Sequence, residues 1–279
     1  MAKVRLDVLL VQKGLFPSRE KARTAIMSRR IQINHVIYDK AGTQVDERAE
    51  IVVLGKDMPY VSRGGYKLEK AIQAFHLQPE GWVMADIGAS TGGFTDCALQ
   101  HGVAKVYAVD VGYGQLAWQL RQDERVVVLE KTNARFLTQQ EIPEPLDLIT
   151  IDASFISLKK LLPALYPLLK PGGQLVALIK PQFEAGRDKV GKKGVVRDPA
   201  VHQEVIAEVV SFAQALAFTV LGLTFSPIRG PEGNIEYLLW LGKGVDKTAL
   251  AQCDMIELPQ KILDTVQQAV EELVGKTEK

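Results

Sequence analysis

The residues best placed to do chemistry follow a short apolar run at residues 83–87, where the chain reads Asp-Ile-Gly-Ala-Ser-Thr-Gly-Gly from residue 86 to residue 93. Glycines in such a turn tolerate positive φ and let the backbone approach a ligand closely. The dinucleotide fingerprint has the spacing Gly-x-Gly-x-x-Gly, which this turn does not match. The carboxylate of Asp86 at the strand end suits a ligand with a positive end, so the pattern favours S-adenosylmethionine over NAD. The alternative is a plain strand-to-helix turn.

Polar side chains recur at the ends of five successive strand-like runs, namely Asp86, Asp110, Asn133, Asp152 and Lys180. Because ligands of open α/β sheets bind beyond the carboxyl ends of the strands, one site could gather all five. Asp110 is placed to accept hydrogen bonds from ribose hydroxyls of a cofactor, and Asn133 to contact its adenine edge. Each residue taken alone could instead be an ordinary strand-end cap or turn residue.

Methyl transfer from a sulfonium is an in-line displacement with a neutral leaving group, so the protein mainly positions the nucleophile and manages its proton. A ribose hydroxyl is a weak nucleophile. A lysine whose charge is opposed by partial burial and another cation can accept or stabilise that proton, while nearby carboxylates orient it. Lys180 terminates a buried apolar strand, which suits this task. A lysine that merely extends its ammonium to solvent is the alternative.

The elements that must position these side chains alternate along the chain. Strand-like runs occur at residues 83–87, 105–109, 126–129, 146–151 and 174–179, separated by helical patterns such as 95–101 and 158–169. Such alternation predicts a parallel, doubly wound α/β sheet. Two closing runs, 218–226 and 235–241, would add a terminal hairpin, and the whole corresponds to the class I (Rossmann-like) methyltransferase architecture.

Length and composition indicate an ordinary globular protein with one main domain of about 200 residues and a small appendage. The 279 residues are 47% hydrophobic, and no window is long and uncharged enough to span a membrane. The N-terminus shows no signal-peptide pattern. Cys97 and Cys253 lie far apart without metal-ligand spacing, so we expect reduced thiols, no metal site and a cytoplasmic location.

The chain carries a net charge of +1, but its charged residues are distributed unevenly between the N-terminal segment and the remainder. Residues 1–56 carry 11 Lys and Arg against 6 Asp and Glu, a net charge of +5, whereas the remainder carries 23 against 27, a net charge of −4. Since affinity for polyanions comes largely from Lys and Arg that neutralise phosphates, a small basic module suggests nucleic acid binding. A merely solvated charged face is the alternative.

This basic module shows two helices followed by short strands. The first helix begins at Arg5 and stops near Gly14, the second begins at Ser18, and strands follow at 31–34, 36–38 and 51–54. Arg-Leu-Asp at residue 5, Ser-Arg-x-x-Ala at residue 18 and Lys-x-Gly-x-x-Val at residue 40 closely resemble the S4-type RNA-binding domain. In that family the second helix and the following turn hold structured RNA. The candidate RNA contacts are therefore Arg5, Arg19, Lys21, Arg23, Arg29 and Arg30, with Arg63 in the next turn.

Five motifs together resemble the TlyA family, historically labelled haemolysins. They are Ser-Arg-Gly-Gly-Tyr-Lys-Leu from residue 62, the glycine turn from residue 86, Asp-Ala-Ser-Phe-Ile-Ser from residue 152, Ile-Lys-Pro-Gln-Phe-Glu from residue 179 and Gly-Val-Val-Arg-Asp from residue 194. The match covers essentially the whole chain. That family is similar to the FtsJ ribosomal RNA methyltransferases, which use a Lys-Asp-Lys-Glu tetrad for 2′-O-methylation of ribose.

The resemblance implies that the catalytic residues are Lys67, Asp152, Lys180 and Glu236. Lys70 competes with Lys67 one helical turn away, and Glu184 competes with Glu236 because it follows Lys180 closely. Glu236 is preferred because its strand precedes the end of the chain as it does in the family. The implied cofactor residues are Asp86, Gly88, Ala89, Ser90, Gly92, Asp110, Val111 and Asn133.

The expected domains are an S4-type RNA-binding domain at 1–58, a linker at 59–64, an FtsJ-like methyltransferase domain at 65–245 and a helical tail at 246–279. The expected function is S-adenosylmethionine-dependent methylation of the ribose 2′-hydroxyl, of cytidine by resemblance, in the ribosomal RNA of one or both subunits. The alternatives are a haemolysin or membrane-active protein, supported by the apolar helix at 158–169, and an RNA-binding protein without catalysis. Segment 186–199, with five cations among glycines, is expected to be a mobile loop that orders on RNA, or an unimportant surface loop.

Overall fold

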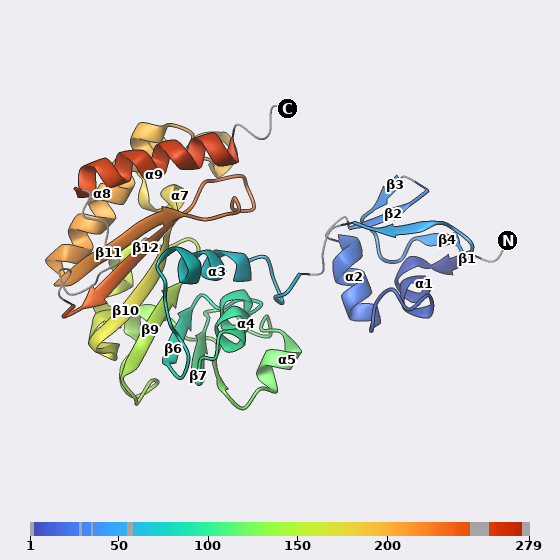
Figure 1. Cartoon of the computed structure of the whole chain (residues 1–279), viewed down its shortest axis with the longest axis horizontal. Helices are drawn as coiled ribbons and strands as arrows, with labels where there is room; N and C mark the ends of the chain where they lie inside the picture. The colour runs from blue at the N-terminus through green and yellow to red at the C-terminus, as the bar shows by residue number, and fades with distance from the viewer. Residues whose placement is uncertain (1–2, 28–29, 35, 55–57, 246–256, 275–279) are drawn as a thin grey trace. The chain divides into compact units, whose positions relative to one another are not determined.

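A computed structural model describes residues 3–27, 30–34, 36–54, 58–245 and 257–274. The chain forms two compact units, residues 1–58 and residues 59–279 (Figure 1). The division falls after Met58, the residue at which the sequence analysis ended the first domain. Each unit has a hydrophobic core of its own, so each is described separately.

The first unit is a small α+β fold around two helices, α1 (Leu6–Gln12) and α2 (Arg19–Met27). Its strands are β1 (Lys3–Arg5), β2 (Ile31–Ile33), β3 (Val36–Tyr38), β4 (Gln44–Asp46) and β5 (Ile51–Val53). They form an antiparallel sheet in the order β3-β2-β5 and a separate pair, β1-β4. The Ser18 hydroxyl accepts a hydrogen bond from the Lys21 N–H at 3.3 Å, which caps the start of α2 as expected.

The start of the first helix differs from the expectation. Arg5 is extended and ends β1, and α1 begins at Leu6. β1 pairs with β4, so Val4 lies opposite Val45. A three-residue strand whose partner lies some 40 residues later gives no local periodic signal, and for this reason the sequence did not reveal it.

The second unit is built on a seven-stranded sheet in the order β11-β12-β10-β9-β6-β7-β8. Its strands are β6 (Val83–Ile87), β7 (Lys105–Val109), β8 (Val126–Leu129), β9 (Leu146–Ile151), β10 (Leu169–Ile179), β11 (Phe218–Phe225) and β12 (Tyr237–Lys243). β6 to β10 are parallel, whereas β12 runs antiparallel to both β10 and β11. The doubly wound sheet with a terminal hairpin is therefore confirmed.

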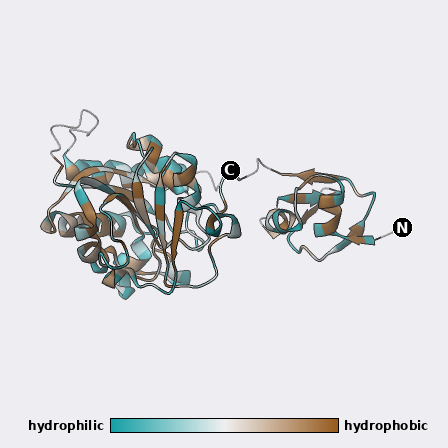
Figure 2. Cartoon of the chain, turned by 90° about the horizontal axis from the view of Figure 1, so that it is seen from below, coloured by the Kyte–Doolittle hydropathy of each residue, from teal (hydrophilic) through white to brown (hydrophobic). Residues whose placement is uncertain are grey.

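Helices cover both faces of this sheet, as the alternation of strands and helices predicts. One face packs against α6 (Leu162–Leu165), α8 (Pro199–Ala215) and α9 (Leu258–Leu273), and the other against α3 (Gly65–Ala74), α4 (Gly93–Gln100) and α5 (Trp118–Arg121). Successive residues of β10 alternate between these two cores, with Leu175 in one and Val176 in the other. The strands are accordingly hydrophobic along their length (Figure 2).

The apolar segment at 158–169 is not the single helix that was expected. It forms three short pieces, namely the 3-10 turn η2 (Leu158–Lys160), the one-turn helix α6 and the 3-10 turn η3 (Tyr166–Leu168). Pro163 and Pro167 lack the N–H that a continuous helix needs, so each limits the preceding turn. Leu158, Leu162 and Leu165 are nevertheless buried in the core, where they cover the sheet.

Candidate active site

Four charged side chains from distant parts of the sequence meet at the carboxyl edge of the sheet in the second unit. Lys67 lies in α3, Asp152 directly follows β9, Lys180 directly follows β10, and Glu236 directly precedes β12. Lys67 Nζ lies 2.7 Å from Glu236 Oε2 and 3.1 Å from Asp152 Oδ2. Lys180 Nζ lies 2.6 Å from Asp152 Oδ1. The four residues thus form a continuous chain of ion pairs in the order Glu236, Lys67, Asp152, Lys180, here called the tetrad.

The four side chains of the tetrad differ in exposure to solvent. The Glu236 side chain is 1% exposed and the Asp152 side chain 19%, which makes Asp152 the most accessible member. Burial alone lowers the pKa of Lys67, but the charges of Asp152 and Glu236 outweigh it and raise that pKa above its ordinary value. Lys67 is therefore a fixed ammonium between two carboxylates. Lys180 also donates to the Ser154 hydroxyl at 3.0 Å, which fixes its direction.

The structure distinguishes the tetrad from its two sequence competitors. Glu184, in α7 (Pro181–Glu184), accepts hydrogen bonds from the Ser157 hydroxyl at 2.6 Å and the Leu158 N–H at 2.7 Å. It holds the start of η2 and makes no ion pair with Lys67. Lys67, rather than Lys70, contacts Asp152 and Glu236. The preferred set of four is the one that converges.

The glycine turn after β6 lies against the loop that carries Asp152. Gly88 has φ +84°, and a Cβ there would come within 2.9 Å of the Asp152 carbonyl oxygen. The Asp152 N–H in turn donates to the Ile87 carbonyl at 2.9 Å. Gly92 has φ +97° and lies against the side chains of Leu116 and Leu120. Only glycine suits these positions, and the result is a tight backbone turn that adjoins the tetrad.

Asp86 lies beneath this turn rather than at its surface. Its side chain is fully buried, and its carboxylate accepts from the Thr95 N–H at 3.0 Å and the Thr95 hydroxyl at 2.7 Å. The Thr150 hydroxyl donates to its other oxygen at 3.2 Å. Burial raises the pKa of Asp86 to about 7, against the opposing effect of the threonine hydrogen bonds. In this position Asp86 joins β6, α4 and β9 and holds the turn in place.

The other expected cofactor residues surround the turn. The Asp110 carboxylate accepts from the Ser90 N–H at 2.8 Å and the Gly112 N–H at 2.7 Å, so it ties two loops together while its remaining lone pairs stay available. Ala89 is buried and Val111 is exposed. The Asn133 side-chain oxygen caps η1 (Ala134–Phe136) by accepting from the Arg135 N–H at 3.1 Å. The expected set lies around the ends of β6, β7 and β8.

Sequence reasoning missed Phe155, although it quoted the motif that contains it. The Phe155 side chain is 91% exposed, and its backbone has φ +63°, a strained conformation for a non-glycine residue. Its ring centroid lies 5.1 Å from that of Phe183, whose ring lies 6.0 Å from Lys180 Nζ. The only signal in the sequence is an aromatic residue within a polar strand-end turn.

In the first unit, a buried acid organises two of the expected RNA contacts. Asp7 is fully buried, and its carboxylate accepts from Arg5 Nε at 3.0 Å and Arg19 at 2.8 Å. The hydrogen bond from Arg5 outweighs burial and holds the pKa of Asp7 down to about 2. Lys21 and Arg23 are exposed, and Arg30 Nε donates to the Leu54 carbonyl at 3.1 Å. Arg29 lies outside the described residues, and Arg63 is exposed in the second unit.

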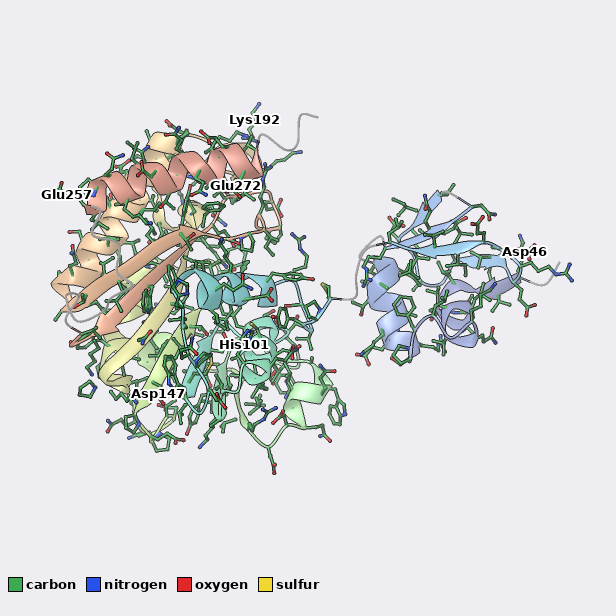
Figure 3. All side chains as sticks on the ribbon, viewed as in Figure 1. Asp46, His101, Asp147, Lys192, Glu257 and Glu272 are labelled. Atoms are coloured by element: carbon green, nitrogen blue, oxygen red, sulfur yellow. The ribbon has the colours of Figure 1, made fainter. Side chains whose placement is uncertain are left out.

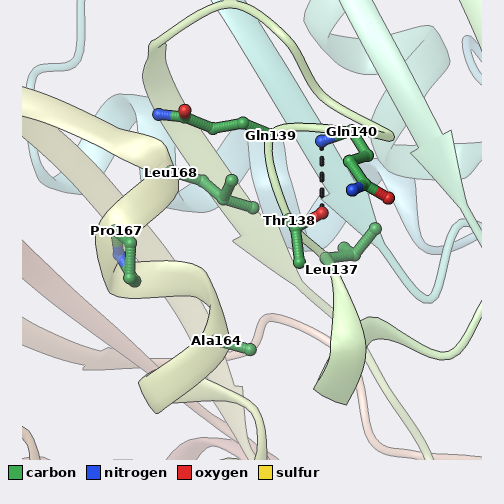
Figure 4. A pocket seen from close by; sticks show the side chains of 7 residues that line it. All are labelled: Leu137, Thr138, Gln139, Gln140, Ala164, Pro167 and Leu168. Atoms are coloured by element: carbon green, nitrogen blue, oxygen red, sulfur yellow. Dashed lines mark hydrogen bonds between the residues drawn. The ribbon is translucent and has the colours of Figure 1, made fainter.

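A surface pocket of about 580 Å³ lies elsewhere in the second unit, between the turn after η1 and the α6 to η3 segment (Figure 4). Its lining consists of Leu137, Thr138, Gln139, Gln140, Ala164, Pro167 and Leu168. None of these side chains titrates, and none belongs to the tetrad or the glycine turn. The pocket therefore offers no acid, base or nucleophile.

Within the described ranges, no helix has the length and apolar character needed to cross a bilayer.

Two family models match the chain. Residues 60–243 match the FtsJ-like methyltransferase family, and residues 4–51 match the S4 domain.

Individual proteins match over nearly the whole chain. A Bacillus subtilis protein named as a candidate rRNA methyltransferase, YqxC, is 50% identical over 95% of this chain and 96% of its own length. The Mycobacterium tuberculosis protein named 16S/23S rRNA (cytidine-2′-O)-methyltransferase TlyA is 45% identical over 90% of this chain and 94% of its own. A solved structure from Streptococcus thermophilus, named as a candidate hemolysin, covers 100% of both chains with a TM-score of 0.77 and 45% identity.

Proposed function

The chain belongs to the TlyA family of proteins that join an S4 domain to an FtsJ-like methyltransferase domain, and on that premise we propose that it methylates ribose 2′-hydroxyls of ribosomal RNA with S-adenosylmethionine. The observation that carries this proposal is the tetrad. Two lysines and two carboxylates in one chain of ion pairs, beside a glycine turn, form a site that can hold a hydroxyl nucleophile and its proton.

The residues around the glycine turn fit the proposed cofactor. The glycine turn follows the carboxyl end of β6 and packs at Gly88 against the Asp152 loop, so a ligand bound beyond the strand ends would lie beside the tetrad. Asp110 has lone pairs for ribose hydroxyls, and Val111 and Asn133 adjoin it on the adenine side. Asp86 contributes indirectly, by holding the turn through Thr95. S-adenosylmethionine, when bound, supplies a methyl group on an electrophilic sulfonium.

The tetrad then has three tasks. Asp152, its most accessible carboxylate, would accept the proton that the 2′-hydroxyl loses when it takes the methyl group and the sulfur, its bond to that carbon broken, leaves as a neutral thioether. The Lys180 ammonium, fixed by Asp152 and Ser154, stabilises negative charge that develops on that oxygen. Lys67 and Glu236 hold Asp152 in place from the buried side.

The RNA assignment draws on the first unit and on the relatives. Arg5 and Arg19 are held in fixed directions by Asp7, and Lys21 and Arg23 are exposed beside them, which suits phosphate contacts. The M. tuberculosis relative is named for cytidine in 16S and 23S rRNA, so cytidine in ribosomal RNA is the proposed target. Phe155 offers an exposed ring beside the tetrad on which a target base could stack. Because ribosomal RNA is the proposed target, the proposed location is the cytoplasm.

The test is to incubate the protein with labelled S-adenosylmethionine and unmodified ribosomal subunits, and then to map the modified nucleotide. We expect label on a ribose 2′-oxygen, and its loss in Lys180→Ala and Asp152→Ala. Absence of ribose methylation by the wild type would overturn the proposal, as would undiminished methylation by both variants. The haemolysin alternative draws on the names of matching proteins, the S. thermophilus structure among them, and on an apolar segment that covers the sheet, and no feature of the site favours it. Lysis of cells by the purified Asp152→Ala variant would revive it.

A further inference from the structure

The segment at 187–197, here called the basic segment, carries charge that the site described above does not use. Lys189 pairs with Glu204 of α8 at 2.6 Å. Arg187, Lys192, Lys193 and Arg197 are exposed and have no carboxylate partner within the described part of the chain. Lys192 extends outward from the surface of the unit (Figure 3). Four free cations on eleven residues form a concentrated positive surface.

One end of the basic segment, which lies within the segment expected to be a mobile or a surface loop, is buried in the body of the unit. It forms the short turns η4 (Arg187–Lys189) and η5 (Lys192–Gly194), and Val195 and Val196 are buried. The sequence analysis gave weight to glycine and charge and overlooked these two adjacent valines. Their burial fixes one end of the segment to the body of the unit.

Asn234 makes the connection between the basic segment and the tetrad. Its side chain is 2% exposed, and it accepts from the Val196 N–H at 3.0 Å and donates to the Gly194 carbonyl at 2.9 Å. The Asn234 side-chain amide thus makes two hydrogen bonds to the backbone of the basic segment, one as acceptor and one as donor. Asn234 lies two residues before Glu236, in a turn that the Gly230 N–H closes by donating to the Asn234 carbonyl at 2.9 Å.

A second link runs parallel to the first. His202 of α8 is buried, with Nε2 2.9 Å from the Val196 carbonyl and Nδ1 2.7 Å from the Tyr237 hydroxyl. Tyr237 directly follows Glu236. The same turn closes tightly over the glutamate, because a Cβ at Gly230 would come within 2.8 Å of Glu236 Oε1. The basic segment is therefore hydrogen-bonded directly to Asn234, before Glu236, and linked through His202 to Tyr237, after it.

We propose that the basic segment binds the phosphate backbone of the substrate RNA and that Asn234 transmits this contact to Glu236, which makes Asn234 a positioning residue. The inference rests on the proposed function and extends it. Contacts to phosphates fix the position of a nucleic acid on the protein surface. Because Asn234 bonds to the basic segment and lies two residues before Glu236, RNA bound to the segment would also fix the positions of Glu236 and Lys67. An acidic protein surface is the competing partner for the same charge, and the experiment below separates the two.

The first arm tests the RNA contact by binding to a protein-free ribosomal RNA fragment without cofactor. We expect the Lys192→Ala/Lys193→Ala variant to bind this RNA about tenfold more weakly. The number of counterions released on binding, obtained from the dependence of affinity on salt concentration, should fall by about two. The matched control is Lys105→Ala/Lys170→Ala, which removes two lysines at the opposite edge of the sheet, paired with Glu144 and Asp147. Equal binding by both double variants would overturn the RNA contact. A defect seen only on intact subunits would assign the surface to a protein.

The second arm tests the coupling by methyl transfer. Asn234→Ala should lower kcat at least tenfold while the Kd of S-adenosylmethionine stays unchanged, and Asn234→Asp, which keeps the acceptor for Val196, should recover part of kcat. When Asn234→Ala is combined with Lys192→Ala/Lys193→Ala, the losses in kcat, expressed as free energies, should be less than additive. Both changes interrupt the same connection between the basic segment and Glu236. Wild-type kcat in Asn234→Ala, or strict additivity, would overturn the coupling. If the wild type transfers no methyl group, the proposed function fails, while the binding arm still tests the RNA contact.

Discussion

The two units of this protein each contain a carboxylate between two cations, and they present these groups to solvent in opposite ways. In the first unit Asp7 is fully buried, whereas the side chains of Arg5 and Arg19 are 47% and 57% exposed. In the second unit the side chains of Lys67 and Lys180 are 9% and 7% exposed, and Asp152 is the accessible partner. The exposed cations of the first unit, here called the outward arrangement, suit the binding of a polyanion from solvent. The buried cations around the more accessible Asp152, here called the inward arrangement, suit a reacting hydroxyl.

The largest effect should come from breaking the inward arrangement. Lys180→Met keeps the length of the side chain and removes its charge, so the reacting oxygen loses its stabilising ammonium. We expect kcat to fall by about 10²- to 10⁴-fold, with the Kd of S-adenosylmethionine little changed, as measured by single-turnover methyl transfer and calorimetry. The control is Lys170→Met, at the start of the same strand and paired with Asp147. A loss of less than about fivefold in Lys180→Met would remove Lys180 from the chemistry.

Glu236, the most buried member of the tetrad, should matter less than Lys180. Glu236→Gln removes one of the two charges that hold Lys67, and displaced catalytic groups cost about 10- to 100-fold in kcat. Glu184→Gln is the matched change, because Glu184 caps η2 and does not contact Lys67. It should reduce the free energy of unfolding by about 1 kcal/mol and preserve kcat. The opposite pattern would exchange the roles of the two glutamates.

The sequence anticipated the elements of the second unit and the members of the tetrad because both depend on short signals. Strands β6 to β9 follow from apolar runs, and Lys67, Asp152 and Lys180 from motifs at strand and helix ends. It did not separate Glu184 from Glu236, since only the antiparallel return of β12 brings Glu236 against Lys67. Nor did it reveal that Asp86 is buried or that Asn234 clasps the basic segment. These features depend on contacts between distant segments.

The outward arrangement in the first unit predicts a stability that depends on pH. The pKa of Asp7 is about 2 in the folded protein, against an ordinary value of 3.8. A carboxyl group with a lowered folded pKa contributes stability above its unfolded pKa, and that contribution disappears as the pH falls through 3.8 toward 2. Allowing for solvent around the arginines, the contribution at pH 7 is about 1–2 kcal/mol.

Asp7→Asn should therefore unfold the first unit more easily at pH 6 than the wild type does, and the difference should shrink at pH 3. Urea titrations of the intact protein, followed by amide NMR signals of residues 6–27, measure this directly. A difference that stays constant between pH 6 and pH 3 would show that the ion pairs with Arg5 and Arg19 are not its source.

The smallest effect should distinguish arginines within the outward arrangement. Arg19 is held by Asp7, whereas Arg23, one turn along α2, is exposed and makes no ion pair among the described residues. Arg19→Gln and Arg23→Gln should each reduce by about one the number of counterions released on RNA binding, as measured from the dependence of affinity on salt concentration. The loss of affinity should be larger for Arg19, by about threefold, because a side chain already fixed loses less entropy on binding. Arg48→Gln, in the turn between β4 and β5, should change neither quantity.

Equal losses at Arg19 and Arg23 would mean that Asp7 stabilises the first unit without orienting its cations. Asp7→Asn resolves this point, because it frees Arg19 without removing its charge. If orientation matters, Asp7→Asn should weaken RNA binding at unchanged salt dependence, and a further Arg19→Gln change should then cost no more than Arg23→Gln does. A carboxylate would in that case serve RNA binding in one unit and methyl transfer in the other in the same way, by holding a cation in a fixed direction.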